Sequence, residues 1–328
     1  MKAPITQSLE WKKLQDDLGE ISFFEQGNGY QYLAILKSTP AGKYLYLPYG
    51  PVFTTKQGLE NSLKSLQNLA KRESAFFIRV EPQSKVFVDH LPTIAQKSTD
   101  LNPAETWVLD LNQDDLDAKL PSRLLRYYKA AAKKGITIET SQNPADIHYL
   151  LDLQKQLAKE KGISTFSEDY LKTELAQPFA TLYLVKHEDP HRRVVPPEGA
   201  PRDVFTGEEA ATGPVETVIA AGLVFDDRTT RYNLQGAQNE QGRKLHATGI
   251  LTIQLIKDAA AAGKQTFDFW GIAPEGAPDN HPWAGFTNFK KTFAGREVVY
   301  SGTYDLVLNP SRYRHYKILR KLNRLIRR

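Results

Sequence analysis

The chain contains no cysteine and only one methionine among its 328 residues. The lack of cysteine excludes disulfides, thiolate chemistry and cysteine-ligated metal sites. No apolar run approaches the roughly 20 residues that a membrane span needs. The opening stretch MKAPITQSLEWKK also has no apolar signal core. These absences predict a cytoplasmic protein without a spanning helix.

Several motifs that mark known chemistry are absent too. The seven histidines are scattered without the spacing of metal ligands, and no P-loop or Ser-His-Asp pattern is present. No heptad repeat is sustained, so we expect no coiled-coil arm. We therefore expect neither a metal nor a cofactor. A hydrophobic content of 41% and a charged content of 25% are ordinary for a soluble globular protein, and the net charge of +5 is mild.

The pattern of strands and helices occurs twice. The first half predicts strands at about 21–26, 31–37 and 43–47, a helix at about 56–72 and a strand at 75–80. The second half predicts strands at 218–225 and 231–235, a helix at about 243–263 and a strand at 266–270. This order indicates two α+β domains related by duplication. Residues 188–216, rich in Pro, Gly and charge, are predicted to form a mobile hairpin insertion.

Two helices are predicted to be basic. In 121–135, Arg123 and Arg126 share one face with three lysines, which suits phosphate groups but is also typical of a solvated helix face. In 312–328, cations alternate with apolar residues and no acid occurs. That second helix can lie on an anionic membrane, bind the acceptor stem of a tRNA, or pack on the first domain.

The stretch 266–304 carries the densest signal for a site. It starts as a strand, breaks at Gly271 into a loop, and continues into an aromatic segment that contains Phe289 and Lys290. A lysine beside a large aromatic ring can be partly desolvated and can then stabilise an anion that forms during a reaction. A solvated pair of surface lysines is the alternative interpretation.

The order of five motifs resembles the Fem family of aminoacyl-tRNA-dependent peptidyltransferases. The chain opens with Q-S-L-E-W, continues with Y-L-P-Y-G-P at 46–51 and I-R-V-E-P at 78–82, and includes the basic helix at 120–135. It closes with D-F-W-G-I, G-F-T-N-F-K-K-T-F-A-G and Y-S-G-T-Y-D-L-V-L-N-P. The resemblance covers most of the chain.

This resemblance implies an α+β fold of two tandem GNAT-like domains without a coiled-coil arm. We expect domain 1 at 1–142, with the helix 311–328 packing on it, and domain 2 at 143–310. The implied reaction transfers an amino acid from aminoacyl-tRNA to the stem-peptide amine of a peptidoglycan precursor. A monomer would suffice for this reaction, and peripheral contact with the inner membrane surface would suit a lipid-linked precursor.

The family pattern also implies roles for single residues. Lys290 would stabilise the oxyanion and the tRNA terminus, with Phe289 lining the pocket, and Glu81 would act as base or orient the amine. Tyr170 would lie near the sugar nucleotide. The remaining residues predicted to bind substrate are Tyr49, Arg79, Trp283, Arg123 and Arg126.

Two positions depart from the family pattern. Phe166 and Gln15 stand where users of soluble UDP-sugars carry an arginine and a lysine that hold the precursor phosphates. Their absence favours lipid II over UDP-MurNAc-pentapeptide as the acceptor.

Two other functions stay open at the level of sequence. An acyl-CoA N-acyltransferase of the same fold would need a glycine-rich pyrophosphate loop, whereas Q-N-E-Q-G-R-K at 238–244 has one glycine. A non-catalytic RNA- or membrane-binding protein would use only the two basic helices.

Overall fold

The computed structural model describes residues 3–92, 94–111, 115–161, 165–194, 212–278, 281 and 283–326. Its chain forms two compact units. Unit 1 contains residues 1–108, 268–291 and 295–328, and unit 2 contains 109–267 and 292–294. The predicted division into domains 1–142 and 143–310 is based on the repeated order of elements and stays a prediction.

Unit 1 is built on a mixed sheet with strand order β1-β2-β3-β5-β14-β6, in which β4 also pairs with β2. The strands are β1 (Ile21–Gly27), β2 (Tyr30–Thr39), β3 (Gly42–Leu47), β4 (Val52–Phe53), β5 (Ala75–Val80), β6 (Ala95–Lys97) and β14 (Tyr304–Val307). Unit 1 also contains the helices α1 (Leu9–Asp17), α2 (Lys56–Arg72) and α9 (Pro310–Ile326). The predicted helix at 56–72 and strand at 75–80 match α2 and β5.

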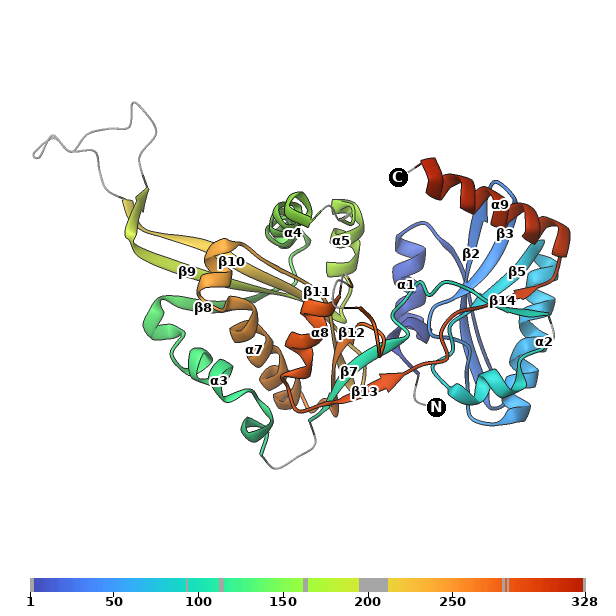
Figure 1. Cartoon of the computed structure of the whole chain (residues 1–328), viewed down its shortest axis with the longest axis horizontal. Helices are drawn as coiled ribbons and strands as arrows, with labels where there is room; N and C mark the ends of the chain where they lie inside the picture. The colour runs from blue at the N-terminus through green and yellow to red at the C-terminus, as the bar shows by residue number, and fades with distance from the viewer. Residues whose placement is uncertain are drawn as a thin grey trace, which may run out of the picture. The chain divides into compact units, whose positions relative to one another are not determined.

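Alternation along β5 sends side chains to two different layers of unit 1. Ile78 and Val80 join the apolar face of α2 in one buried cluster. Phe77 joins Tyr313 of α9 in another cluster, so α2 and α9 cover opposite faces of the sheet (Figure 1). Because successive side chains of a strand point to opposite faces, Arg79 lies on the same face as Phe77.

The second sheet has strand order β13-β7-β12-β11-β10-β9-β8. Its strands are β7 (Glu105–Asp110), β8 (Ile136–Ser141), β9 (Ala180–Val194), β10 (Thr212–Asp226), β11 (Thr230–Gln238), β12 (Thr266–Gly271) and β13 (Arg296–Val299). The remaining helices are α3 (Ser122–Lys129), α4 (Ile147–Lys161), α5 (Glu168–Leu175), α6 (Glu240–Lys244), α7 (Ala247–Ala261) and α8 (Ala284–Lys291). In unit 2, β8 to β11 form an antiparallel meander. The helix α7 is largely buried and packs on β10 and β11.

Two helix predictions were wrong in their bounds. The basic helix predicted at 121–135 ends at Lys129, and a short 3-10 turn leads to Gly135, whose φ of 66° stops the chain from continuing as a helix. The helix predicted at 243–263 is two helices, because His246 adopts a left-handed φ of 58° between α6 and α7. Of the predicted insertion 188–216, residues 195–211 lie outside the described residues.

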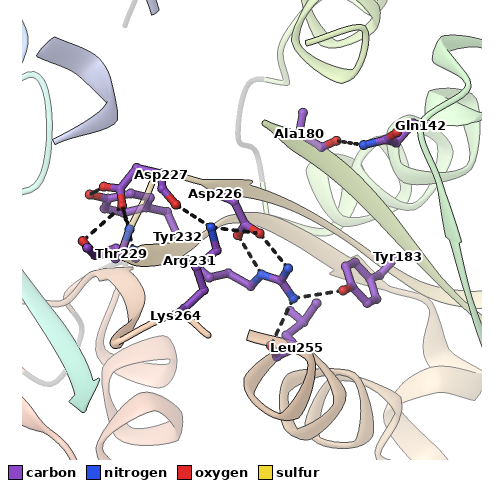
Figure 2. A network of polar contacts seen from close by, with 11 residues as sticks. Gln142, Ala180, Tyr183, Asp226, Asp227, Thr229, Arg231, Tyr232, Leu255 and Lys264 are labelled. Carbon is purple, nitrogen blue, oxygen red and sulfur yellow. Dashed lines mark hydrogen bonds and ion pairs between the residues drawn. The ribbon is translucent and has the colours of Figure 1, made fainter. Parts of the chain in front are cut away.

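A polar network fixes the β10–β11 hairpin of unit 2 (Figure 2). The Arg231 guanidinium, 5% exposed, donates two hydrogen bonds of 2.8 Å to the carboxylate of Asp226. It also donates to the hydroxyl of Tyr183 at 2.9 Å. Within the hairpin turn, Asp227 accepts hydrogen bonds from the backbone N–H groups of Thr229 and Thr230 and from the Tyr232 hydroxyl. The hairpin is thus held by charged hydrogen bonds inside one unit.

Candidate active site

The end of β12 departs from regular strand geometry. Phe267, Asp268 and Phe269 are all buried, and Trp270 has a left-handed φ of 66°. The Asp268 carboxylate accepts hydrogen bonds from the Trp270 N–H at 2.7 Å and from the Thr106 hydroxyl. A tryptophan in this conformation is strained, so its surroundings must hold it there.

Lys290 reaches this strand end from α8. Its ammonium donates a 2.6 Å hydrogen bond to the carbonyl oxygen of Gly271. Burial lowers the pKa of Lys290 to about 8, and the negative charge of Asp268 partly opposes that shift. Within the described part of the chain, Lys290 forms no ion pair. The result is a partly buried cation whose hydrogen-bond partner is a neutral carbonyl.

The helix α8 is fixed to the strand exit at a second point. The Thr287 hydroxyl accepts a 2.8 Å hydrogen bond from the N–H of Ala273 and donates to the carbonyl of Trp283. Thr287 and Lys290 are three residues apart, so they share one face of α8. Gly271 allows this close approach: a Cβ there would lie 2.5 Å from Pro103 Cγ and 3.3 Å from the ring of Trp283.

Tyr49 contacts the same strand end from another segment of unit 1. It is 4% exposed, has a left-handed φ of 54°, and donates its hydroxyl to the carbonyl of Pro103 at 3.0 Å. Its ring meets Trp270 edge-on at a centroid distance of 5.5 Å, and Tyr300 at 5.4 Å. Two touching aromatic residues in the left-handed region are costly, and such strain gathers at functional sites.

Glu81 is 3% exposed and tightly bound. One carboxylate oxygen accepts from the Thr303 hydroxyl and the N–H groups of Leu101 and Asn102; the other accepts from the Tyr46 hydroxyl and the Asn102 amide. Five donors occupy the lone pairs that a general base would need. The carboxylate therefore holds the 101–102 loop, which leads directly to Pro103.

Arg79 lies on the face of the unit 1 sheet that α9 covers. It is 2% exposed, and its guanidinium donates two hydrogen bonds of 2.7 Å to Asp305 and one to Ser98. The Tyr313 hydroxyl donates to the same aspartate at 2.7 Å. These contacts give Arg79 a role in the fold of unit 1, and its predicted contact with substrate stays a prediction.

The two other predicted residues of unit 1 lie on or beside α8. Trp283 precedes the helix, is 40% exposed, and packs on Gly271. Phe289 is partly buried on α8. Unit 1 therefore gathers Lys290, Trp283 and Tyr49 around the end of β12.

The predicted residues of unit 2 form separate groups. The Tyr170 ring stacks on Phe166 at 5.1 Å, and its hydroxyl binds the buried carboxyl of Glu174, whose pKa burial raises to about 7. On α3, Arg123 donates to the Tyr127 hydroxyl at 3.0 Å, and Arg126 is exposed. Asp117, which precedes α3, pairs with Lys129 of that helix at 3.3 Å.

The sequence analysis missed Asp268, Gly271 and Thr106 as parts of the site. One signal was available for Asp268, because it is a carboxylate inside the apolar run of β12. Nothing in the sequence marks Thr106, which lies 162 residues away. Among the described residues, no group of three or more His, Asp or Glu side chains is arranged to hold a metal ion.

This arrangement can stabilise a developing anion. A partly desolvated ammonium beside a buried strand end interacts strongly with nearby negative charge, because water screens it poorly. Of the helices that the structure describes, none has the length and apolarity to cross a bilayer.

Comparisons with known proteins identify the fold. Residues 202–321 match the model of the FemAB family. The whole chain is similar to the crystal structure of FemX, with 17% identity, a TM-score of 0.77, and coverage of 95% of this chain and 94% of that one. The search of curated sequences found no match.

Two further solved structures are similar at lower TM-scores. L-PGS from Bacillus licheniformis is 14% identical, with a TM-score of 0.56 and coverage of 100% of this chain and 99% of that one. The C-terminal domain (DUF2156) of a putative lysylphosphatidylglycerol synthetase from Agrobacterium fabrum is 14% identical, with a TM-score of 0.55 and coverage of 93% and 89%. The predicted α+β fold class is confirmed, because the whole chain has the fold of FemX.

Proposed function

We propose that this chain is a member of the FemAB family, which its match to the family model over residues 202–321 and its similarity to FemX support, and that it transfers an amino acid from an aminoacyl-tRNA to the stem-peptide amine of a peptidoglycan precursor. The family supports a transferase that builds peptidoglycan bridges. The aminoacyl ester is already activated, so the chemistry requires proximity, a cation for the tetrahedral oxyanion and a route for the amine proton.

Lys290 carries this proposal. A lysine whose pKa is lowered to about 8 is still mostly charged at neutral pH, yet its charge is poorly solvated. An oxyanion forming nearby would supply the negative partner that this ammonium lacks in the described structure. Removing one such donor typically lowers a rate constant by about 10²–10³-fold.

The neighbouring residues support Lys290 in different ways. We propose that Trp283, Phe289 and Tyr49 line the site, and that Glu81 positions the loop at Pro103 instead of acting as base. In unit 2 we propose that Tyr170, Arg123 and Arg126 contact substrate, the two arginines through phosphate groups.

A lipid-linked acceptor is favoured over a soluble one. Gln15 is 6% exposed, and Phe166 is 53% exposed with its ring against Tyr170. Neither side chain can pair with a phosphate as the arginine and lysine of the family do. We therefore propose lipid II as the acceptor, with UDP-MurNAc-pentapeptide as the rival.

The test is transfer of radiolabelled amino acid from a mixed aminoacyl-tRNA pool to each acceptor. The variant Lys290→Met should lose transfer, whereas Lys291→Met serves as its matched control. Lys291 is the adjacent cation on α8, but it is exposed and pairs with Glu297 at 3.2 Å.

Label on lipid II that Lys290→Met loses and Lys291→Met keeps would support the proposal. Label on UDP-MurNAc-pentapeptide alone would support the transfer reaction but overturn the preference for lipid II as acceptor. If no acceptor is labelled and acetyl-CoA is consumed instead, the protein is an acyl-CoA transferase.

A further inference from the structure

The helix α9 has two apolar faces, and only one of them is covered. Tyr313 is 5% exposed and packs with Phe77 of β5 at a ring distance of 5.3 Å. On the opposite side, Ile318 and Leu322 are 53% and 49% exposed. Residues four apart are neighbours on a helix, so these two aliphatic side chains form one continuous outward patch.

Positive charge lies along the same helix. The sequence of α9 contains no acidic residue, and Arg314, Lys317, Arg320 and Lys321 fall within two turns. None of these four forms an ion pair within the described part of the chain. A helix with aliphatic residues between unpaired cations is typical of segments that lie on anionic bilayers.

A polar cavity of about 320 Å³ opens beside α9, within unit 1. Lys97, Ser98 and Thr99, at the end of β6, form one wall, and Lys317, Arg320 and Lys321 form the other. Lys97 donates to the carbonyl of Ser301 at 2.9 Å and lies over the ring of Tyr304. Ammonium, guanidinium and hydroxyl donors that converge in this way suit a phosphate group.

The one carboxylate that lines this cavity is already neutralised. Asp305 accepts two hydrogen bonds from the Arg79 guanidinium and one from the Tyr313 hydroxyl. Nearby, Asp100 accepts from the N–H of Thr303. The four cations of the cavity therefore present a net positive charge to whatever enters it.

We propose that α9 docks this protein on an anionic phospholipid surface. The phosphate of one lipid occupies the cavity between α9 and β6, and Ile318 and Leu322 enter the boundary between headgroups and acyl chains. Such a surface explains the cations and the exposed aliphatic pair together.

RNA would explain only the cations. The acceptor stem of a tRNA is a duplex that proteins bind mainly through phosphate and 2′-OH contacts, and such contacts give no role to the exposed aliphatic pair of Ile318 and Leu322. The proposal does not depend on the transfer reaction, because surface binding requires no acceptor or aminoacyl-tRNA.

Co-sedimentation with vesicles tests the docking. One set contains phosphatidylcholine alone, and the other includes about one third phosphatidylglycerol. The wild-type chain should bind the anionic vesicles and bind neutral ones weakly. Lys317→Gln/Lys321→Gln should lower anionic binding about 30-fold, because each cation near such a surface contributes about 1 kcal/mol. Ile318→Ser/Leu322→Ser should lower it about tenfold without a change in charge.

Matched controls come from the same unit. Lys56→Gln/Lys64→Gln removes two exposed cations of α2, and Leu9→Ser/Ile21→Ser removes two aliphatic side chains that are 60% and 58% exposed. Both controls should bind vesicles as the wild type does, and thermal unfolding should show that all four variants are folded.

Three results would overturn the proposal. The first is equal binding of the wild-type chain to neutral and anionic vesicles. The second is loss of vesicle binding in the controls as large as in the α9 variants. The third is an α9 variant that retains vesicle binding and loses binding of uncharged tRNA, which would make α9 an RNA surface.

Discussion

The molecule holds buried cations of two kinds. Arg79 in unit 1 and Arg231 in unit 2 each donate two hydrogen bonds to an aspartate of the neighbouring antiparallel strand. Each aspartate–arginine pair is joined by a tyrosine hydroxyl, from Tyr313 in unit 1 and Tyr183 in unit 2. These contacts raise the pKa of both arginines, so their charges are fixed.

Lys290 is the other kind. Its ammonium binds the neutral carbonyl of Gly271, and burial lowers its pKa to about 8. A bidentate carboxylate neutralises the charge of an arginine and leaves little to attract an anionic ligand. A lysine without such a partner keeps part of its charge unsatisfied. The comparison separates cations whose charge is matched by a carboxylate from one whose hydrogen-bond partner is a neutral carbonyl.

The largest expected change in stability follows when a buried arginine loses its carboxylate partner. Asp305→Ala should lower the free energy of unfolding by about 3–5 kcal/mol, because it leaves the Arg79 charge buried and unpaired. Asp226→Ala should cost less, since the Asp226 side chain is 23% exposed. Urea unfolding measures both. The double variant Arg79→Met/Asp305→Leu should recover most of the loss; a double variant as unstable as Asp305→Ala would contradict this account.

Lys290→Met should lower transfer without lowering stability, the reverse of what we expect for Asp305→Ala. We expect transfer to fall about 10²–10³-fold while the free energy of unfolding stays the same or rises, because a poorly solvated charge is removed. Transfer assays and urea unfolding on the same preparation give the two values. A variant that loses stability as Asp305→Ala does would place Lys290 among the structural cations.

Glu81→Gln tests a buried anion in the same way. The new amide would place a donor against the Tyr46 hydroxyl or Asn102, so stability should fall by about 1–3 kcal/mol. Transfer should fall only modestly and keep its dependence on pH. If instead the rate drops 100-fold or more at unchanged stability, Glu81 is a base.

Gly271→Ala perturbs the partner of Lys290. The added Cβ would lie 2.5 Å from Pro103 Cγ, so the strand end must shift, at a cost of about 1–3 kcal/mol in stability and with reduced transfer. Gly285→Ala on α8 is the matched control, since nothing lies within 4 Å of its Cβ. Equal effects of the two substitutions would show that the close packing at Gly271 is unimportant.

The smallest effect is on the dependence of stability on pH. The pKa of Lys290 is about 8 in the folded chain, against an ordinary value of 10.5. The unfolded chain therefore binds the proton more tightly, and the destabilising contribution of Lys290 is full below pH 8 and disappears as the pH rises toward 10.5.

Relative to Lys290→Met, the wild-type chain should gain about 1–2 kcal/mol of unfolding free energy across that range, since one pKa unit corresponds to about 1.4 kcal/mol and solvent reduces the effect at a partly exposed group. Parallel pH profiles of the two proteins would contradict the lowered pKa.

The pattern of residues along the chain determined the local elements of this protein. The leucines of α2 repeat at helical spacing, and Thr55 caps that helix on the N–H of Gly58. Gly29, with a φ of 78°, lies in the turn between β1 and β2, where the sequence Gly-Asn-Gly at 27–29 favours a hairpin. Resemblance to the family, rather than spacing, singled out Lys290. The helix, its cap and the hairpin turn depend on residues that are close in sequence, so the sequence alone can specify them.

Only the tertiary structure decided which charges are satisfied. Arg79 and Asp305 are 226 residues apart and pair because β5 lies beside β14. The same packing fills the lone pairs of Glu81 and twists Trp270 into the left-handed region, while it leaves Lys290 with a carbonyl. Residue type alone cannot distinguish these outcomes, because the solvation and partners of a charge are set by contacts between distant segments.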